Sequence, residues 1–252
     1  MIRKIKEGES VLLLGDDATY MVRAAKRGFN VDGGLIELDT LIGKPFGSVI
    51  KTHKGREFIA VEPNTNDLLA KRMRRLPQVI TPKDMGLIVG MTGIQCNAKI
   101  VEAGTGSGHG TLFLARYCSK GKIYSYELRR DFFENVKQNL EGIGVKNVSL
   151  TNADIKLGFK ERDVDLVLLD MIGAEDVIEM AFRALKPGAF LVVYSPYIEQ
   201  VKAVVDNIKK FRFTNCFTVE NMLRHWDVRD HTLPQRFGTM HTGFMTFARK
   251  LA

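Results

Sequence analysis

The sequence contains little cysteine and no long apolar run, and each absence excludes a class of protein. Among its 252 residues there are only three cysteines, Cys96, Cys118 and Cys216. Their wide spacing fits neither a zinc site nor a disulfide framework. Each lies in an apolar or strand-forming context, so we expect all three to be buried. No apolar stretch reaches the length of a membrane span, and no signal-peptide core follows the basic N-terminus, so a cytoplasmic protein is expected.

Acidic residues do not balance the basic ones, and the excess lies at the two ends of the chain. The net charge is +8. Residues 1–80 carry 14 Lys and Arg against 10 Asp and Glu, and residues 200–252 carry 9 against 4. Residues 81–199 carry 14 against 15. Basic flanks fit a nucleic-acid partner, because clustered Lys and Arg bind backbone phosphates. An ordinary basic protein without such a partner is the alternative.

A glycine-rich turn in the middle of the chain is the strongest local signal. Residues 99–101 read as the end of a buried strand, and a helix follows from Thr111. The dinucleotide fingerprint requires a third glycine where His109 stands, and no P-loop Gly-Lys-Ser/Thr is present. What remains is an E-x-G-x-G-x-G turn before a helix N-terminus, which predicts a nucleotide-like pocket rather than an empty loop. Its candidate binding residues are Glu102, Gly104, Thr105, Gly106, Ser107 and Gly108.

The periodicity of the chain predicts an α/β fold with two domains. Residues 1–75 contain short strands separated by turns, typical of a small barrel or sandwich. A basic helix over 68–75, capped by Asn66 or Asp67, ends this part, and Thr81 is expected to cap the next helix. Residues 76–252 alternate apolar strands with helices, which predicts a doubly wound parallel sheet. Its last two strands, 211–219 and 243–249, are expected to pair.

Four of the predicted parallel strands end in an acidic residue. Ligands of such sheets bind beyond the carboxyl ends of the strands, so these acids point to one shared crevice. Glu127 can accept the two hydroxyls of a ribose. Asp154 can accept from an adenine amino group, or serve as an ordinary turn residue. Glu102 reads as a structural hydrogen-bond partner or as a contact to the ligand, and Asp170 is the fourth acid.

The glycine turn resembles motif I of the class I methyltransferases that use S-adenosylmethionine. Further motifs make the chain similar to the TrmI family, the tRNA adenine-N1 methyltransferases, in its archaeal branch. The resemblance implies a Rossmann-like sheet with a small N-terminal β-domain, a homotetramer, and methylation of adenine in the tRNA T-loop at position 57, 58 or both. The segments that carry it, besides the glycine turn, are Gln78–Asp84, Tyr124–Glu127, Asn152–Asp154, Leu168–Asp170, Val193–Pro196 and His241–Phe244.

Asp170 is the residue we expect to carry the chemistry. A carboxylate that accepts from the exocyclic amino group of adenine increases the electron density at N1 and stabilises the positive methylated ring. This role needs an ionised acid and no raised pKa. Many relatives have a proline and an aromatic residue next, whereas Met171 and Ile172 follow here. Tyr194 is therefore our candidate for stacking on the target base, with a core strand position as the alternative.

The segment from Arg224 to His241 is basic with interleaved aromatic residues, so it fits either an RNA contact or an intersubunit arm. The spacing of His225, His231 and His241 matches no metal-ligand pattern, and no metal is expected. Two other functions stay open at this point. One is a methyltransferase for another substrate, such as a protein isoaspartyl residue or a precorrin. The other is a nucleic-acid-binding module without activity.

Overall fold

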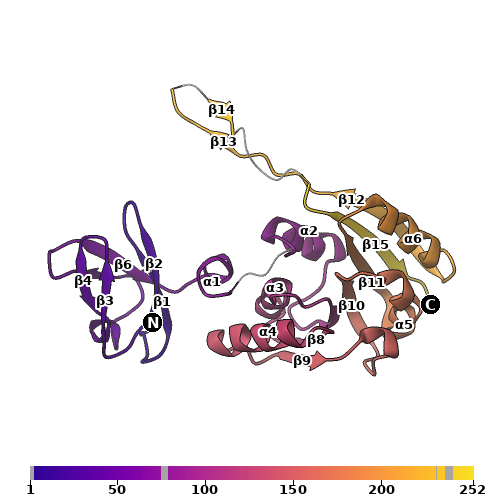
Figure 1. Cartoon of the computed structure of the whole chain (residues 1–252), viewed down its shortest axis with the longest axis horizontal. Coiled ribbons are helices and arrows are strands. Elements are labelled where there is room, and N and C mark those ends of the chain that lie inside the picture. The colour runs from indigo at the N-terminus through magenta and orange to yellow at the C-terminus, as the bar shows by residue number, and fades with distance from the viewer. Residues whose placement is uncertain (1–2, 75–78, 231, 236–240) are drawn as a thin grey trace. The chain divides into compact units, whose positions relative to one another are not determined.

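The computed structural model describes residues 3–74, 79–230, 232–235 and 241–252 (Figure 1). The chain divides into two compact units, residues 1–73 and residues 74–252. The domain boundary that we expected, between residues 75 and 76, falls outside the described residues. Among the residues described, no helix is both long enough and apolar enough to cross a membrane.

The first unit is built from short antiparallel strands, as the sequence predicted. A four-stranded sheet has the order β2-β1-β6-β5, and a separate hairpin pairs β3 with β4. Side chains from both, including Leu13, Ile36 and Phe58, are fully buried in one core. The strands are β1 (Ser10–Leu14), β2 (Thr19–Arg23), β3 (Gly28–Val31), β4 (Gly34–Glu37), β5 (Ser48–Lys51) and β6 (Glu57–Val61), with the 3₁₀ helix η1 (Leu38–Leu41) between β4 and β5.

The helix that ends this unit begins earlier than we expected. Helix α1 spans Thr65–Lys71, and its N-cap is Asn64 rather than Asn66 or Asp67. The Asn64 side chain accepts from the Asp67 N–H (3.0 Å), and the Asp67 carboxylate accepts from the Asn64 N–H (2.9 Å). This reciprocal capping box satisfies two N–H groups at once, which a cap at Asn66 or Asp67 would not do.

The second unit is a seven-stranded sheet with the order β12-β15-β11-β10-β7-β8-β9. The strands from β11 to β9 pair in parallel, whereas β15 is antiparallel to both β11 and β12. The predicted pairing of the last two long strands is therefore confirmed. Their bounds are β7 (Lys99–Ala103), β8 (Lys122–Glu127), β9 (Val148–Asn152), β10 (Val164–Leu169), β11 (Leu185–Ser195), β12 (Phe213–Glu220) and β15 (Phe244–Lys250).

Helices cover both faces of this sheet, because neighbouring residues of each buried strand point to opposite sides. Val101 and Val167 pack with α5 and α6 on one face, and Ile100 and Leu166 pack with α2 and α3 on the other. The sheet is therefore doubly wound. Its helices are α2 (Pro82–Thr92), α3 (His109–Tyr117), α4 (Arg130–Ile143), α5 (Ile178–Ala184) and α6 (Ile198–Ile208), with two 3₁₀ helices, η2 (Ile155–Leu157) and η3 (Ala174–Val177).

The connection from β12 to β15 carries a short hairpin. Strand β13 (Trp226–Asp227) pairs antiparallel with β14 (Leu233–Pro234). We call the described part of this connection, residues 221–230, 232–235 and 241–243, the arm (Figure 1). The arm exposes five apolar side chains, Met222, Leu223, Trp226, Val228 and Leu233.

Candidate active site

The glycine turn lies at the carboxyl end of β7, next to the end of β10. Gly104, Gly106 and Gly108 all have positive φ, at 83°, 58° and 81°, a conformation that L side chains rarely adopt. A Cβ on Gly104 would lie 1.8 Å from the carbonyl oxygen of Asp170. The Asp170 N–H donates to the Ala103 carbonyl (2.9 Å). The turn therefore needs glycine at 104 both for its backbone and for its contact with the next strand.

A pocket opens above this turn, and six of the residues proposed from the sequence line it. They are Glu102, Gly104, Thr105, Gly106, Ser107 and Asp170. The pocket is completed by Val79, Ile80, His109 and Gly110, which were not among the binding residues proposed from the sequence. The acids Glu127 and Asp154 and the ring of Tyr194 are not part of its lining.

Glu127, at the end of β8, binds the backbone of the glycine turn. Its side chain is buried, and its two carboxylate oxygens accept from the N–H groups of Gly106 (2.9 Å) and Arg129 (2.9 Å). A carboxylate has about four acceptor positions, so roughly two remain for ligand hydroxyls. The ribose role expected for Glu127 stays a prediction that this geometry allows.

Glu102 lies deeper, in a network of hydroxyl groups beneath the turn. Its Oε2 accepts from Thr111 (2.6 Å) and Ser125 (2.7 Å), and Ser125 also bonds the Thr105 hydroxyl (2.7 Å). The pKa of Glu102 is raised to about 7, chiefly by burial and also by the charge of Glu127, while the two hydroxyls act against this shift. Thr111 and Ser125 were missed by sequence reasoning, because a hydroxyl in a strand or helix carries no motif of its own.

Asp170 lines the pocket. Its carboxylate accepts no hydrogen bond from the residues that the structure describes, so it is available to a ligand. Burial raises the pKa of Asp170 to about 7, and the charges of Glu102 and Glu127 add to the shift. The role that we assigned to Asp170 needs its ionised form, and this shift makes that form the minor one below about pH 7. The charges of Glu102 and Glu127, which come from separate strands, disfavour ionisation of Asp170.

Asp154 is drawn into a local turn. Its Oδ1 accepts from the Lys156 N–H (2.9 Å), which caps the short helix η2. This is the ordinary turn role that the sequence left open. This hydrogen bond occupies Oδ1 of the carboxylate. The contact with an adenine amino group stays a prediction, and it would use Oδ2.

Tyr194 is a core residue rather than an open stacking platform. Its side chain is only 6 % exposed, and a Cβ on Gly243 would lie 2.5 Å from its ring. Burial raises the pKa of Tyr194, and its hydroxyl lies 3.4 Å from Asp84 Oδ2. The structure therefore places Tyr194 in the core position that we named as the alternative to base stacking.

A buried ion pair near Tyr194 fixes both ends of the arm to helix α2. The Asp84 side chain is fully buried and accepts from Lys83 Nζ (2.7 Å), Thr81 (3.0 Å) and Thr242 (2.8 Å). Lys83 Nζ also donates to the Asn221 carbonyl and to the Thr242 hydroxyl. Thr81 is the N-cap of α2 as expected, but its hydroxyl bonds the Asp84 side chain instead of a backbone N–H.

Asn139 on α4 was also missed from the sequence. Its Nδ2 donates to the carbonyls of Ser107 (3.1 Å) and Arg74 (3.3 Å), and its Oδ1 accepts from the Arg74 N–H (3.1 Å). The side chain thus ties the glycine turn to the first residue of the second unit. An asparagine on a helix has no signal in the sequence that would reveal this role.

The three cysteines differ from one another, against our expectation. Cys118 is buried, whereas Cys96 and Cys216 are exposed. Strand β12, which carries Cys216, has most of its residues exposed, and Cys96 lies in the loop before β7. Within the described ranges, no group of three His, Cys, Asp or Glu side chains could hold a metal ion.

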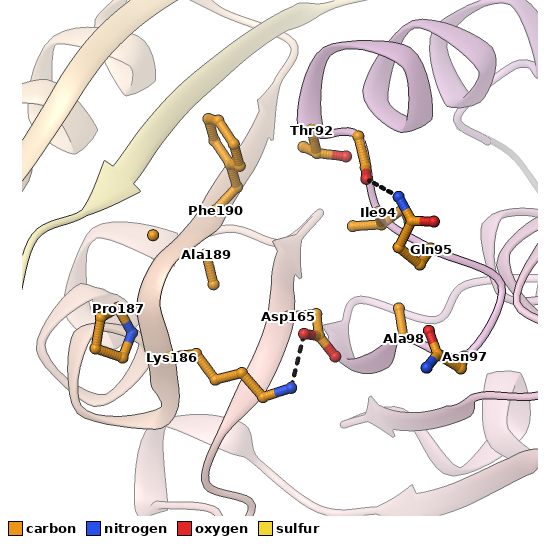
Figure 2. A pocket seen from close by; sticks show the side chains of 12 residues that line it. Thr92, Ile94, Gln95, Asn97, Ala98, Asp165, Lys186, Pro187, Ala189 and Phe190 are labelled. Carbon is orange, nitrogen blue, oxygen red and sulfur yellow. Dashed lines mark hydrogen bonds and ion pairs between the residues drawn. The ribbon is translucent and has the colours of Figure 1, made fainter.

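A second, larger cavity of about 250 Å³ lies at the opposite end of the sheet, against about 20 Å³ at the glycine turn. Figure 2 shows Lys186 reaching Asp165 in its wall. Asp165 also accepts from the Lys99 N–H (2.8 Å), and Gln95 donates to the Gly93 carbonyl (3.1 Å). These polar groups are already bonded to other groups of the protein, so they are not available to bind a ligand. We therefore do not assign the reactive site to this cavity, although it is the larger of the two.

The seven-stranded sheet, the glycine turn after β7 and the acids at the carboxyl ends of β8 and β10 define a class I methyltransferase. Residues 57–239 match the family described as the tRNA methyltransferase complex GCD14 subunit, and the chain belongs to this family. The sequence is 32% identical to the tRNA (adenine(57)-N(1)/adenine(58)-N(1))-methyltransferase TrmI of Methanocaldococcus jannaschii, over 91% of this chain and 90% of that protein.

Two solved structures are similar over nearly the whole chain. The tRNA (m1A58) methyltransferase TrmI of Aquifex aeolicus has a TM-score of 0.80 and 26% identity, covering 99% of this chain and 100% of that one. A SAM-dependent O-methyltransferase of Thermotoga maritima has a TM-score of 0.85 and 29% identity, covering 99% and 95%. The predicted fold class and the family resemblance are confirmed.

Proposed function

We propose that the protein transfers a methyl group from S-adenosylmethionine to N1 of adenine in the T-loop of tRNA, at position 57, 58 or both. The observation that carries this proposal is the available Asp170 carboxylate beside a glycine turn, in a chain that belongs to a tRNA methyltransferase family. Curated relatives that act on tRNA adenine align over nine-tenths of the chain.

The residues around the turn fit such a donor. A Cβ on Gly106 would meet only one atom within 4 Å, the Gly104 carbonyl oxygen at 3.9 Å, so the main chain is open on this side. Glu127 keeps acceptor positions for the two ribose hydroxyls, and the positive end of the α3 dipole would favour the methionine carboxylate. When bound, S-adenosylmethionine supplies an electrophilic methyl group.

Asp170 acts on the other reactant. In its ionised form it accepts a hydrogen bond from the exocyclic amino group of adenine, which raises the electron density at N1. It also stabilises the positive charge that the ring gains on methylation. The raised pKa of Asp170, about 7, means that this form becomes dominant only above neutral pH. The contact between Asp170 and the Gly104 turn keeps the acid at a fixed position relative to the donor site.

We assign Tyr194 a positioning role instead of base stacking. Its buried ring supports Gly243, and its hydroxyl lies near the ion pair of Lys83 and Asp84. This fixes the end of β11, two strands from the pocket turn.

We also propose that the protein is a homotetramer, as the family resemblance implies. The five exposed apolar side chains of the arm support association, since such side chains rarely gather on a monomer surface without a partner. Light scattering coupled to size-exclusion chromatography measures the mass directly. Exchange of Trp226 and Leu233 for serine is expected to lower that mass.

The direct test of function is transfer of labelled methyl groups to an unmodified tRNA transcript, followed by digestion and identification of the nucleoside. We expect N1-methyladenosine, and transcripts with guanosine at 57, at 58 or at both identify the position. A label in a nucleoside other than N1-methyladenosine, or no label in RNA, would contradict the proposal. Parallel reactions with an isoaspartyl peptide and with a precorrin test the other methyltransferase substrates.

A further inference from the structure

The pocket at the glycine turn contains a histidine that takes no part in the chemistry assigned to Asp170. His109 is the first residue of α3, and it lines the pocket together with Ser107. Both side chains are buried. The His109 Nδ1 and the Ser107 Oγ lie 2.7 Å apart, which is the distance of a short hydrogen bond. The two side chains therefore form one polar pair inside the pocket.

The backbone around Ser107 is held in place, so the hydroxyl hydrogen is the part of the pair that can move. The Ser107 carbonyl accepts from Asn139 Nδ2 (3.1 Å), and the Gly108 N–H donates to the Thr105 carbonyl (2.9 Å). A single hydrogen lies between Oγ and Nδ1. Either the hydroxyl donates it to the imidazole, or Nδ1–H donates it to the hydroxyl oxygen. In the second arrangement, the hydroxyl hydrogen can be donated to a ligand.

The charges around the pocket are separated. Two acids, Glu102 and Asp170, line one part of it. His109 begins α3 and so lies at the positive end of the helix dipole, and the N-cap residue, Gly108, has no side chain that could accept from the helix end. An anionic group is repelled by the acids in their ionised forms and attracted by the helix end. The pocket therefore favours a ligand whose anion lies at the pair of Ser107 and His109.

We propose that Ser107 donates its hydroxyl hydrogen to the carboxylate of the methyl donor, and that His109 positions this hydrogen by donating Nδ1–H to the Ser107 oxygen. This inference rests on the proposed function, because S-adenosylmethionine carries one carboxylate beside its ammonium and sulfonium groups. Ser107 is then a binding residue, and His109 is a positioning residue that acts through it. The pair makes the site selective for a donor with an intact carboxylate.

The experiment measures the affinity for S-adenosylhomocysteine and for its decarboxylated analogue by isothermal titration, without tRNA. The ratio of the two dissociation constants reports recognition of the carboxylate. A hydrogen bond to a charged group changes affinity about 10-fold or more, so we expect His109→Leu and Ser107→Ala each to lower the wild-type ratio by about 10-fold. The double variant should lower it no further, because the two side chains act as one unit.

Two control variants separate this role from a structural one. His109→Asn keeps an N–H at the same number of bonds from Cβ as Nδ1, so it should retain most of the wild-type ratio. Asn147→Leu removes two hydrogen bonds at the other end of α3, which Asn147 Nδ2 donates to the carbonyls of Ala115 (2.9 Å) and Cys118 (2.9 Å). It should lower the Tm and leave the ratio unchanged.

Three results would overturn the inference. Equal weakening of both ligands by His109→Leu would make His109 a structural residue. A ratio that falls as far in His109→Asn as in His109→Leu would show that the N–H does not matter. A ratio that changes in Asn147→Leu would show that it reports the packing of α3 instead of the carboxylate.

The ligand measurements contain no tRNA, so they are independent of the test of function. If the wild type methylates tRNA and the ratio is the same in all variants, the inference is wrong while the function stands. If the ratio changes as expected and no methyl group reaches tRNA, the proposed substrate is wrong and the carboxylate contact stands. A wild type that binds neither ligand and methylates no tRNA would overturn both.

Discussion

Gly104 lies directly against the main chain of Asp170, with room for a hydrogen atom and none for a Cβ, which would stand 1.8 Å from the Asp170 carbonyl oxygen. The hydrogen bond from the Asp170 N–H to Ala103 joins the same two segments. The turn that we assign to the donor and the acid that we assign to the acceptor base are thus parts of one rigid contact. Their relative position is set by main-chain atoms.

Gly104→Ala is expected to disrupt this contact. The new Cβ must displace the Asp170 backbone, and an L residue at φ 83° adds strain of about 1–2 kcal/mol. We expect the affinity for methyl donor to fall by about 100-fold or more and the free energy of unfolding to fall by about 2 kcal/mol or more. Isothermal titration and urea denaturation measure the two effects.

The matched control is Gly86→Ala, on the exposed side of α2, where a Cβ meets nothing within 4 Å. It should raise stability by about 0.5–1 kcal/mol, because alanine is the better helix former, and leave donor binding unchanged. A Gly104→Ala protein that binds donor as tightly as this control would show that the turn is not the donor site.

The buried pair of Lys83 and Asp84 is expected to behave as a coupled unit. Either Lys83→Met or Asp84→Leu leaves the other charge buried alone, because Asp84 is fully buried and the Lys83 side chain is 14% exposed. Each single variant should lose about 3 kcal/mol of unfolding free energy. The double variant should lose clearly less than the sum. Additive losses in a double-mutant cycle would show that the pair is not coupled.

The cysteines give a chemical test of the fold. Cys96 and Cys216 are exposed, whereas burial raises the pKa of the Cys118 thiol to about 11. The thiolate is the reactive form, so both the burial of Cys118 and its raised pKa slow its reaction. A disulfide reagent at pH 8 should label two thiols of the native protein quickly and the third only after unfolding. Mass spectrometry of the labelled peptides identifies them, and rapid labelling of Cys118 would speak against the packing of α3.

Glu102 makes stability depend on pH in a defined direction. Its pKa is raised from 4.5 to about 7 in the folded protein, so the folded state holds the proton more tightly than the unfolded state. Stability from this group is complete below about pH 4.5 and is lost as the pH rises to about 7. The Tm of Glu102→Gln relative to wild type should therefore increase across this window and stay constant above it. Parallel Tm curves for the two proteins would contradict the raised pKa.

The succession of strands and helices along the chain and the place of the pocket could be predicted from the sequence, whereas the protonation of the acids in the site could not. Apolar runs and the glycines around Gly106 are local signals, and the acids Glu127 and Asp170 are located by the strands that they end. The raised pKa of Asp170 depends on carboxylates from two other strands, so it follows only from the folded arrangement. The same holds for Asp84, whose partners Tyr194 and Thr242 are more than a hundred residues away in sequence.

Local chemistry also left choices that only packing resolved. Asn64, Asn66 and Asp67 are all good N-cap residues, and the capping box selected Asn64. Cys216 lies in an apolar strand, but that strand is an outer one in which most residues face solvent. Sequence patterning shows that a strand exists and does not show how well its two faces are covered.

The central claim, that ionised Asp170 activates the acceptor, is tested most directly by single-turnover methyl transfer to tRNA as a function of pH, for the wild type and for Asp170→Asn. We predict that the wild-type rate rises with pH, levels off above about 7, and exceeds the variant's rate by about 10²–10⁴-fold on this plateau. Donor and tRNA affinities of the variant should stay within about 3-fold of wild type. A variant rate close to that of the wild type with the same pH profile, or a loss of donor affinity as large as the loss of rate, would contradict the account.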